Sequence, residues 1–343
     1  RGVVLRPGLA PPTRSSPSTL ATVTAPVIVA DVVRNEFVEG HHHGSVVVTG
    51  PAGTVEFAAG VVDRPMFPRS CNKPMQALGM LRAGLDLDGE LLALAAASHS
   101  GEDFHLAGVR RILAGAGLSE SALRTPPAYP LDERARDDWI RAGHRVEAIT
   151  MNCSGKHAAM LATCVANGWD TDSYRDPEHP VQRAIRRAVE DTAGEPAAAI
   201  AVDGCGAPLL AISLAGLARA FGRLASADPA TFEGRIADAY RRHPEYASGS
   251  RRDEAALMRS VPGLFCKGGA EAVYAVGLAD GRGIAVKIDD GASRARAVVV
   301  AATLRWLGVD NDVIRAQLEH PLLGGGQPVG SVRPAAELTT LLS

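Results

Sequence analysis

The sequence predicts an α+β fold, in which strands from both chain ends share one mostly antiparallel sheet and helices fill the middle. Three observations support this prediction. Stretches rich in β-branched residues, separated by turn signals, occur near both ends of the 343-residue chain. The middle is rich in Ala and Leu at helical spacing. Strand and helix patterns do not alternate, as they would around a parallel sheet.

The N-terminal part starts with a polar segment, residues 1–25, which is rich in Pro, Ser, Thr and Arg and is expected to be a flexible leader. Residues 26–343 are expected to form a single domain. The three histidines at 41–43 are expected to lie in a loop. The strands around that loop are expected at 26–33, 44–49 and 53–58.

The helical pattern begins near Pro74, which suits the first turn of a helix because no N–H is needed there. Asp280-Gly281 separates two later β-branched stretches and predicts a hairpin. The expected helices are 74–83, 91–98, 104–116, 156–167, 180–192, 210–221, 232–243 and 293–306, and the two late strands are 272–278 and 283–288.

The composition argues against two classes of partner. A net charge of −2 and a pI near 6.6 provide no basic field for nucleic acid, and 4% aromatic residues leave little for base stacking. Neither a run of 18 apolar residues nor the apolar core of a signal peptide is visible, so we expect a cytoplasmic protein without a membrane partner. A homodimer is expected only because twofold assemblies are common.

The chain has five cysteines at irregular spacing, and an odd number does not suit a disulfide framework. Free thiols in a reducing compartment fit better. Cys164 lies in a helical stretch and is expected to be a core residue. The other four, Cys71, Cys153, Cys205 and Cys266, lie close to lysine or glycine motifs.

Lysine is rare in this chain, with four lysines against thirty-two arginines. Arg keeps its proton in proteins, whereas a Lys that is desolvated or placed near another cation can become a neutral base or a metal ligand. Lys73, Lys156 and Lys267 lie in motifs that resemble sites, so we expect a requirement for neutral amines there. Chance survival of surface lysines is the alternative.

Ser70 precedes Lys73 by three residues, where a helix is expected to begin. This spacing places both side chains on one helix face, and a neutral amine there can take the hydroxyl proton. Alone the spacing is a weak signal. Its weight comes from a later serine motif, with Ser98 favoured over Ser100, and from Lys267 ahead of a strand, an order similar to that of penicillin-recognising serine enzymes. A helix-end serine and a strand-edge charge are the structural alternatives.

A second cluster combines Cys153-x-x-Lys156 with Cys205. Thiolates bind zinc, and a lysine ligand would have to be deprotonated. Spacing alone favours structural thiols, because a strong zinc signal has four ligands or paired CxxC motifs.

Five ordered motifs together resemble the Rhizobium-type L-asparaginase II family, over roughly residue 27 to the C-terminal helices. The motifs are Ser-Cys-Asn-Lys-Pro-Met-Gln from Ser70, Ser-His-Ser-Gly-Glu from Ser98, Asn-Cys-Ser-Gly-Lys-His from Asn152, Asp-Gly-Cys-Gly-Ala-Pro from Asp203 and Lys-Gly-Gly-Ala-Glu from Lys267. The resemblance implies a fold similar to serine β-lactamases and glutaminases, with 26–343 as the catalytic domain.

The same resemblance implies an L-asparaginase that forms a seryl acyl-enzyme and acts on L-asparagine. It implies Ser70 with Lys73 and Ser98 with Lys267 as two dyads, Zn²⁺ on Cys153, Lys156 and Cys205, and Arg69 and Asp203 as supporting residues. A glutaminase differs by one methylene and stays an alternative. A β-lactamase or peptidase would call for an export signal. A non-catalytic binding protein held by structural zinc is the alternative from a different class.

Overall fold

The computed structural model describes residues 25–343, so the expected leader at 1–25 lies, apart from Ala25, outside the described residues. Its main feature is an eight-stranded sheet in the order β10-β11-β1-β2-β9-β8-β7, with β3 paired to β2. Every pairing in this sheet is antiparallel. The strands are β1 (Val27–Arg34), β2 (Phe37–Thr49), β3 (Val55–Ala59), β7 (Phe265–Gly268), β8 (Val273–Gly277), β9 (Gly283–Ile288), β10 (His320–Gly324) and β11 (Gln327–Pro334).

Strands from the two chain ends pair directly, which confirms the predicted α+β arrangement. Val46 of β2 faces Val286 of β9, and Val32 of β1 faces Val332 of β11. These positions are buried, as expected where β-branched side chains pack on a sheet face. A smaller antiparallel sheet has the order β4-β6-β5, with β4 (Pro65–Met66), β5 (Ala199–Val202) and β6 (Pro208–Ser213).

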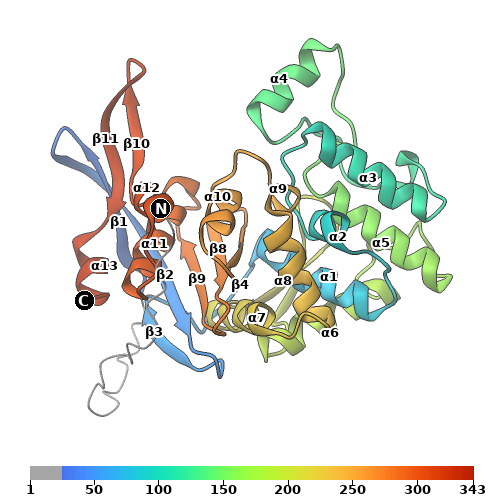
Figure 1. Ribbon diagram of the computed structural model, residues 1–343, viewed down its shortest axis with the longest axis horizontal. Helices are drawn as coiled ribbons and strands as arrows, with labels where there is room; N and C mark the ends of the chain where they lie inside the picture. The colour runs from blue at the N-terminus through green and yellow to red at the C-terminus, as the bar shows by residue number, and fades with distance from the viewer. Residues whose placement is uncertain (1–24) are drawn as a thin grey trace.

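The helical middle of the chain lies beside the main sheet, as the cyan-to-green ribbons of Figure 1 show. All residues of β8 are buried, because α7 and α11 both pack on it. The helices are α1 (Lys73–Arg82), α2 (Gly89–Ala95), α3 (Asp103–Gly115), α4 (Glu133–Arg141), α5 (Ser154–Asn167), α6 (Pro180–Ala193), α7 (Leu214–Ser226), α8 (Phe232–Arg242), α9 (Pro244–Ala247), α10 (Asp253–Ser260), α11 (Ser293–Trp306), α12 (Asp312–Gln317) and α13 (Ala336–Leu341), with short 3₁₀ turns η1 (Arg69–Asn72) and η2 (Glu120–Ala122).

Two local predictions were wrong. Residues 41–43 are not a loop but part of the long strand β2, where His42 is buried and its Nδ1 lies 2.5 Å from Asp290 Oδ2. The stretch 210–221 is not one helix, because β6 occupies its start and Ser213 caps α7 by accepting from the Gly216 N–H. An apolar stretch of this length does not distinguish a buried strand from a helix.

One hydrophobic cluster includes residues of the sheet and of the helical middle, such as Val46, Leu94 and Phe265. Cys164 is fully buried in it, as expected. None of the helices in residues 25–343 is both long and apolar enough to cross a membrane.

Candidate active site

Lys73, the first residue of α1, is fully buried and hydrogen-bonded at its amine. Its Nζ donates to Ala97 O at 2.6 Å, to Ser98 Oγ at 2.9 Å and to Cys153 Sγ at 3.1 Å. An ammonium group has three protons to donate, so these three acceptors match a protonated amine.

Lys267 approaches the same hydroxyl from the sheet side. It lies on β7, is 1% exposed, and its Nζ donates to Ser98 Oγ at 3.0 Å and to Gly268 O at 2.6 Å. Burial, and secondarily the charge of Lys73, lower the pKa of Lys267 to about 7. The structure therefore contains one lysine amine that is neutral in a large fraction of molecules near neutral pH.

Ser98, in the loop between α2 and α3, bridges the two lysines. Ser98 Oγ accepts from both lysine amines here. A neutral Lys267 also has a lone pair, so it can accept the Ser98 hydroxyl proton while Lys73 still donates to Ser98. Ser100 points elsewhere, since its Oγ donates to Ser248 O at 3.2 Å. The geometry thus selects Ser98 over Ser100 as the serine that faces both lysines.

Ser70 lies in η1, one turn before Lys73, and is half-buried. The Lys73 backbone N–H donates to Ser70 O. Within the described part of the chain, however, the Ser70 and Lys73 side chains are not hydrogen-bonded to each other. A Cβ added to Gly269 would lie 3.4 Å from Ser70 N, so the chain after β7 passes against Ser70. The adjacent Cys71 Sγ donates to Lys267 O at 3.0 Å, which fixes η1 to β7.

Arg69 precedes Ser70 with a backbone φ of 51°, in the left-handed region that is rare for a residue other than glycine. Such a conformation costs of order 1–3 kcal/mol and persists where the surroundings hold it. The guanidinium is held by Asp203, 3.0 Å from Nε, and by Glu271, 3.5 Å from Nη1. These ion pairs connect η1 to the loops after β5 and after β7.

The predicted metal residues also converge. Cys153 precedes α5, Lys156 lies in its first turn, and Cys205 lies between β5 and β6; all three are buried. Lys156 Nζ donates to Cys205 Sγ at 3.1 Å. A hydrogen bond from Cys153, together with Lys156, holds the pKa of Cys205 well below its usual range despite burial. Burial alone would lower the pKa of Lys156, but Cys205 and Cys153 outweigh it and raise that pKa.

The side chains of Cys153, Lys156 and Cys205 meet the requirements of the expected zinc only in part. No group of three or more His, Cys, Asp or Glu side chains in residues 25–343 is arranged to hold a metal ion, so a zinc site here would need the Lys156 amine. Two thiols and an amine are donors that zinc accepts once they are deprotonated. The buried Nε2 of His157 has no hydrogen-bond partner, while Nδ1 of the same ring is 2.7 Å from Tyr174 OH. The two thiols and the amine are therefore chemically suitable for zinc, but they are not a usual set of Cys, His and carboxylate ligands.

A buried ionic cluster formed by Arg252, Glu254 and Arg296 was not predicted from the sequence. Arg252 Nη2 lies 2.9 Å and Arg296 Nη2 3.5 Å from Glu254 Oε1, and the Glu254 side chain is fully buried. Arg-Asp-Glu at the start of a helix has the pattern of a solvated helix end, so no local signal distinguishes it.

The family comparison agrees with the motifs. The sequence model of the L-asparaginase II family matches residues 30–334. The structure is similar to that of a β-lactamase from Mycobacterium bovis, at 16% identity and a TM-score of 0.43 over 76% of this chain and 94% of that one. It is also similar to the structure of Mglu, at 15% identity and a TM-score of 0.35 over 78% and 68% of the two chains. No curated protein matches the sequence.

Proposed function

Because this chain belongs to the L-asparaginase II family, we propose that it hydrolyses the side-chain amide of L-asparagine to L-aspartate and ammonia through an ester on Ser70. The observation that supports this most strongly is the pair of buried lysine amines on Ser98 Oγ, at 2.9 and 3.0 Å. A serine hydroxyl needs a base, and a lysine with a lowered pKa is one.

The proton would travel through the bridge between the lysines. Ser98 passes its proton to the neutral Lys267, Lys73 passes one to Ser98, and Lys73 then takes the proton of Ser70 as its oxygen attacks the amide carbon. After these three transfers Lys73 and Ser98 carry the same protons as before. The net change is one proton lost by Ser70 and one gained by Lys267. The amide C–N bond breaks as this proton returns to the leaving nitrogen, which releases ammonia and leaves the ester.

Water would complete the cycle along the same route. The two lysines take a proton from water as its oxygen attacks the ester carbon. That proton returns to Ser70 when the ester bond breaks and aspartate leaves.

Two backbone N–H groups are candidates for stabilising the tetrahedral oxygen. The Gly269 N–H is already used, since it donates to Val273 O at 2.8 Å. The N–H groups of Ser70 and Ala270 make no hydrogen bond within the described part of the chain; the first belongs to the proposed nucleophile, and the second follows Gly269, which passes against Ser70. We therefore assign the oxyanion role to these two, where one donor is worth roughly 10²-fold to 10³-fold in kcat.

Zinc would be held by Cys153, Lys156 and Cys205, and its contribution when bound would be to fix the amino or carboxylate end of the substrate. Cys153 accepts from Lys73, so this cluster contacts the serine-lysine centre directly. Arg69 and Asp203 would support both centres through their ion pair.

Ammonia release from L-asparagine and L-glutamine, measured side by side, tests the proposal. Ser70→Ala should lower kcat by at least ~10²-fold, and Ser100→Ala is the matched serine control that should not. Mass spectrometry of the acid-quenched enzyme should find the aspartyl adduct on Ser70. Near-normal turnover by Ser70→Ala would refute the nucleophile, and a preference for glutamine would make the chain a glutaminase.

A further inference from the structure

The buried ionic cluster of Arg252, Glu254 and Arg296 packs directly against the backbone that carries Lys267. A Cβ added to Gly268 would fall on the Arg296 guanidinium and 2.5 Å from Glu254 Oε1. Gly268 O is also the acceptor for Lys267 Nζ. The cluster therefore packs against the peptide unit to whose carbonyl Lys267 donates one of its two hydrogen bonds.

Two helices hold the cluster in place. Arg252 and Glu254 lie at the start of α10, and Arg252 uses both Nε and Nη2 to bind the Glu254 carboxylate, at 3.1 and 2.9 Å. Arg296 comes from α11 and lies over the Tyr274 ring at 5.2 Å. A buried carboxylate between two guanidiniums is well held, because removing one partner would leave an uncompensated charge.

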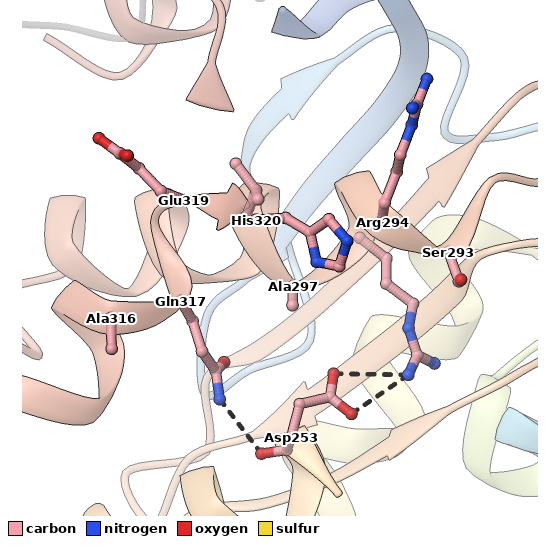
Figure 2. A pocket seen from close by; sticks show the side chains of 10 residues that line it. Asp253, Ser293, Arg294, Ala297, Ala316, Gln317, Glu319 and His320 are labelled. Atoms are coloured by element: carbon pink, nitrogen blue, oxygen red, sulfur yellow. Dashed lines mark hydrogen bonds and ion pairs between the residues drawn. The ribbon is translucent and has the colours of Figure 1, made fainter. Parts of the chain in front are cut away.

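The outer side of the cluster opens on a cavity of about 310 Å³ between α10, α11 and α12. Figure 2 shows Asp253 at the edge of this cavity, with the Gln317 side chain reaching its backbone. Arg296 donates to the Asp253 carboxylate at 3.3 Å. The cluster thus spans from an open pocket to the buried face of β7.

Glu254 is the carboxylate among the charged groups that act on Lys267. The ionisable groups that act on Lys267 include Lys73 from α1, Cys71 from η1, Arg252 and Glu254 from α10, Arg296 behind Gly268, and Cys266 on β7 itself. Burial raises the pKa of the Cys266 thiol, so it is uncharged. Burial raises the pKa of the Cys71 thiol to about 12, so Cys71 is uncharged at neutral pH. The charges that act on Lys267 are therefore cationic except for Glu254.

We propose that Glu254, held between Arg252 and Arg296, is a positioning residue that sets the charge state of Lys267 from outside the substrate pocket. This inference rests on the proposed function only for its catalytic consequence. Glu254 favours the protonated amine and Arg252 disfavours it, so the two residues act on Lys267 with opposite signs although they bind each other.

The charge state of Lys267 can be measured directly, because a chain with only four lysines gives few lysine signals in an NMR spectrum. In protein labelled with ¹⁵N at lysine Nζ, the Lys267 signal is assigned by its absence in Lys267→Arg, and its titration midpoint is then followed by NMR. Glu254→Gln should lower that midpoint by about one pH unit or more, and Arg252→Gln should raise it, since a charge within reach moves a pKa by about one to three units. Arg252→Lys keeps the charge and should restore the original midpoint.

A matched control lies on the same helix. Arg259 pairs with Glu245 at 3.0 Å near the surface, and Arg259→Gln removes one charge there without facing Lys267, so it should leave the midpoint unchanged. Shifts of Glu254→Gln and Arg252→Gln in the same direction, or no shift in either, would overturn the proposal. If Glu254→Gln does not fold, the two Arg252 variants decide by themselves.

The pH profile of kcat/KM separates this inference from the proposed function. If Lys267 is the base, the acid limb should move with the NMR midpoint in each variant. A midpoint that moves while the acid limb stays would support the role of Glu254 and refute Lys267 as the base.

Discussion

Two buried lysine centres lie side by side in this protein, and the pKa values of their lysines shift in opposite directions. At Ser98, Lys267 lies near another lysine, and burial together with that charge lowers its pKa to about 7. At the thiol cluster, Lys156 is equally buried, but two cysteines and Asp203 raise its pKa. Burial is common to both sites, so the neighbouring charges decide which amine keeps its proton.

The largest expected effect comes from replacing the neutral lysine with a permanent cation. Lys267→Arg should lower kcat by roughly 10²-fold to 10⁴-fold, because Arg cannot accept the proton of the serine relay. The loss of kcat is measured as the rate of ammonia release from asparagine, and circular dichroism checks that the variant is folded. Substantial activity in Lys267→Arg would mean that a positive charge alone is needed at Ser98.

The pH dependence sharpens the same contrast. The proposed base, Lys267, has a pKa of about 7 and must be neutral to act, so kcat/KM should fall as pH drops through that value. The expected loss approaches tenfold per pH unit below the pKa, or roughly fiftyfold between pH 7 and pH 5. A flat profile across this range would contradict the assignment of Lys267 as the base.

Removing a thiol tests whether the second centre binds metal. Cys205→Ser should reduce bound zinc, measured by elemental analysis, and raise KM about tenfold, as expected for one lost substrate contact of about 1.4 kcal/mol. Cys164→Ser, a buried thiol away from both centres, is the control and should leave zinc content and KM unchanged. Equal zinc content in wild type and Cys205→Ser would remove the metal from the proposal.

The smallest effect concerns the packing that sets the spacing between the centres. A Cβ at Gly155 in α5 would lie 2.5 Å from Leu94 O of α2, so Gly155→Ala must push apart the helices that carry Lys156 and lead to Ser98. We expect a loss of about 1–3 kcal/mol in the free energy of unfolding. Gly115→Ala in α3 meets nothing within 4 Å and serves as the control in urea titrations. Equal stability of both variants would show that α5 can shift freely.

Much of this arrangement was predictable from the sequence, because the signals were local. The β-branched ends, the Ala- and Leu-rich middle and the motif around each candidate site lysine are stretches of neighbouring residues. The rarity of lysine gave weight to Lys73, Lys156 and Lys267, which are indeed the buried ones. The pairing of the N-terminal strands with the late strand β9 also followed from these patterns, whereas β10 and β11 were not predicted.

The features that could not be predicted from the sequence depend on contacts between distant segments. The bridge from Lys73 through Ser98 to Lys267 joins residues from three elements, and the spacing of Ser70 and Lys73 suggested a different partner for the amine. The role of Glu254 appears only when α10 packs on β7. His42 looked like a loop residue because its partners, Asp290 and Arg294, lie about 250 residues further along the chain.

The burial of three lysines has a practical consequence for handling the protein. Lys73, Lys156 and Lys267 are each 1% exposed, whereas Lys287 on β9 is half-buried, with its amine on the carbonyls of Glu271 and Ile288. A mild amine-reactive ester should therefore modify the lysine side chains of the native fold at Lys287 alone. Coupling to a solid support through that side chain would present every copy of the enzyme in one orientation.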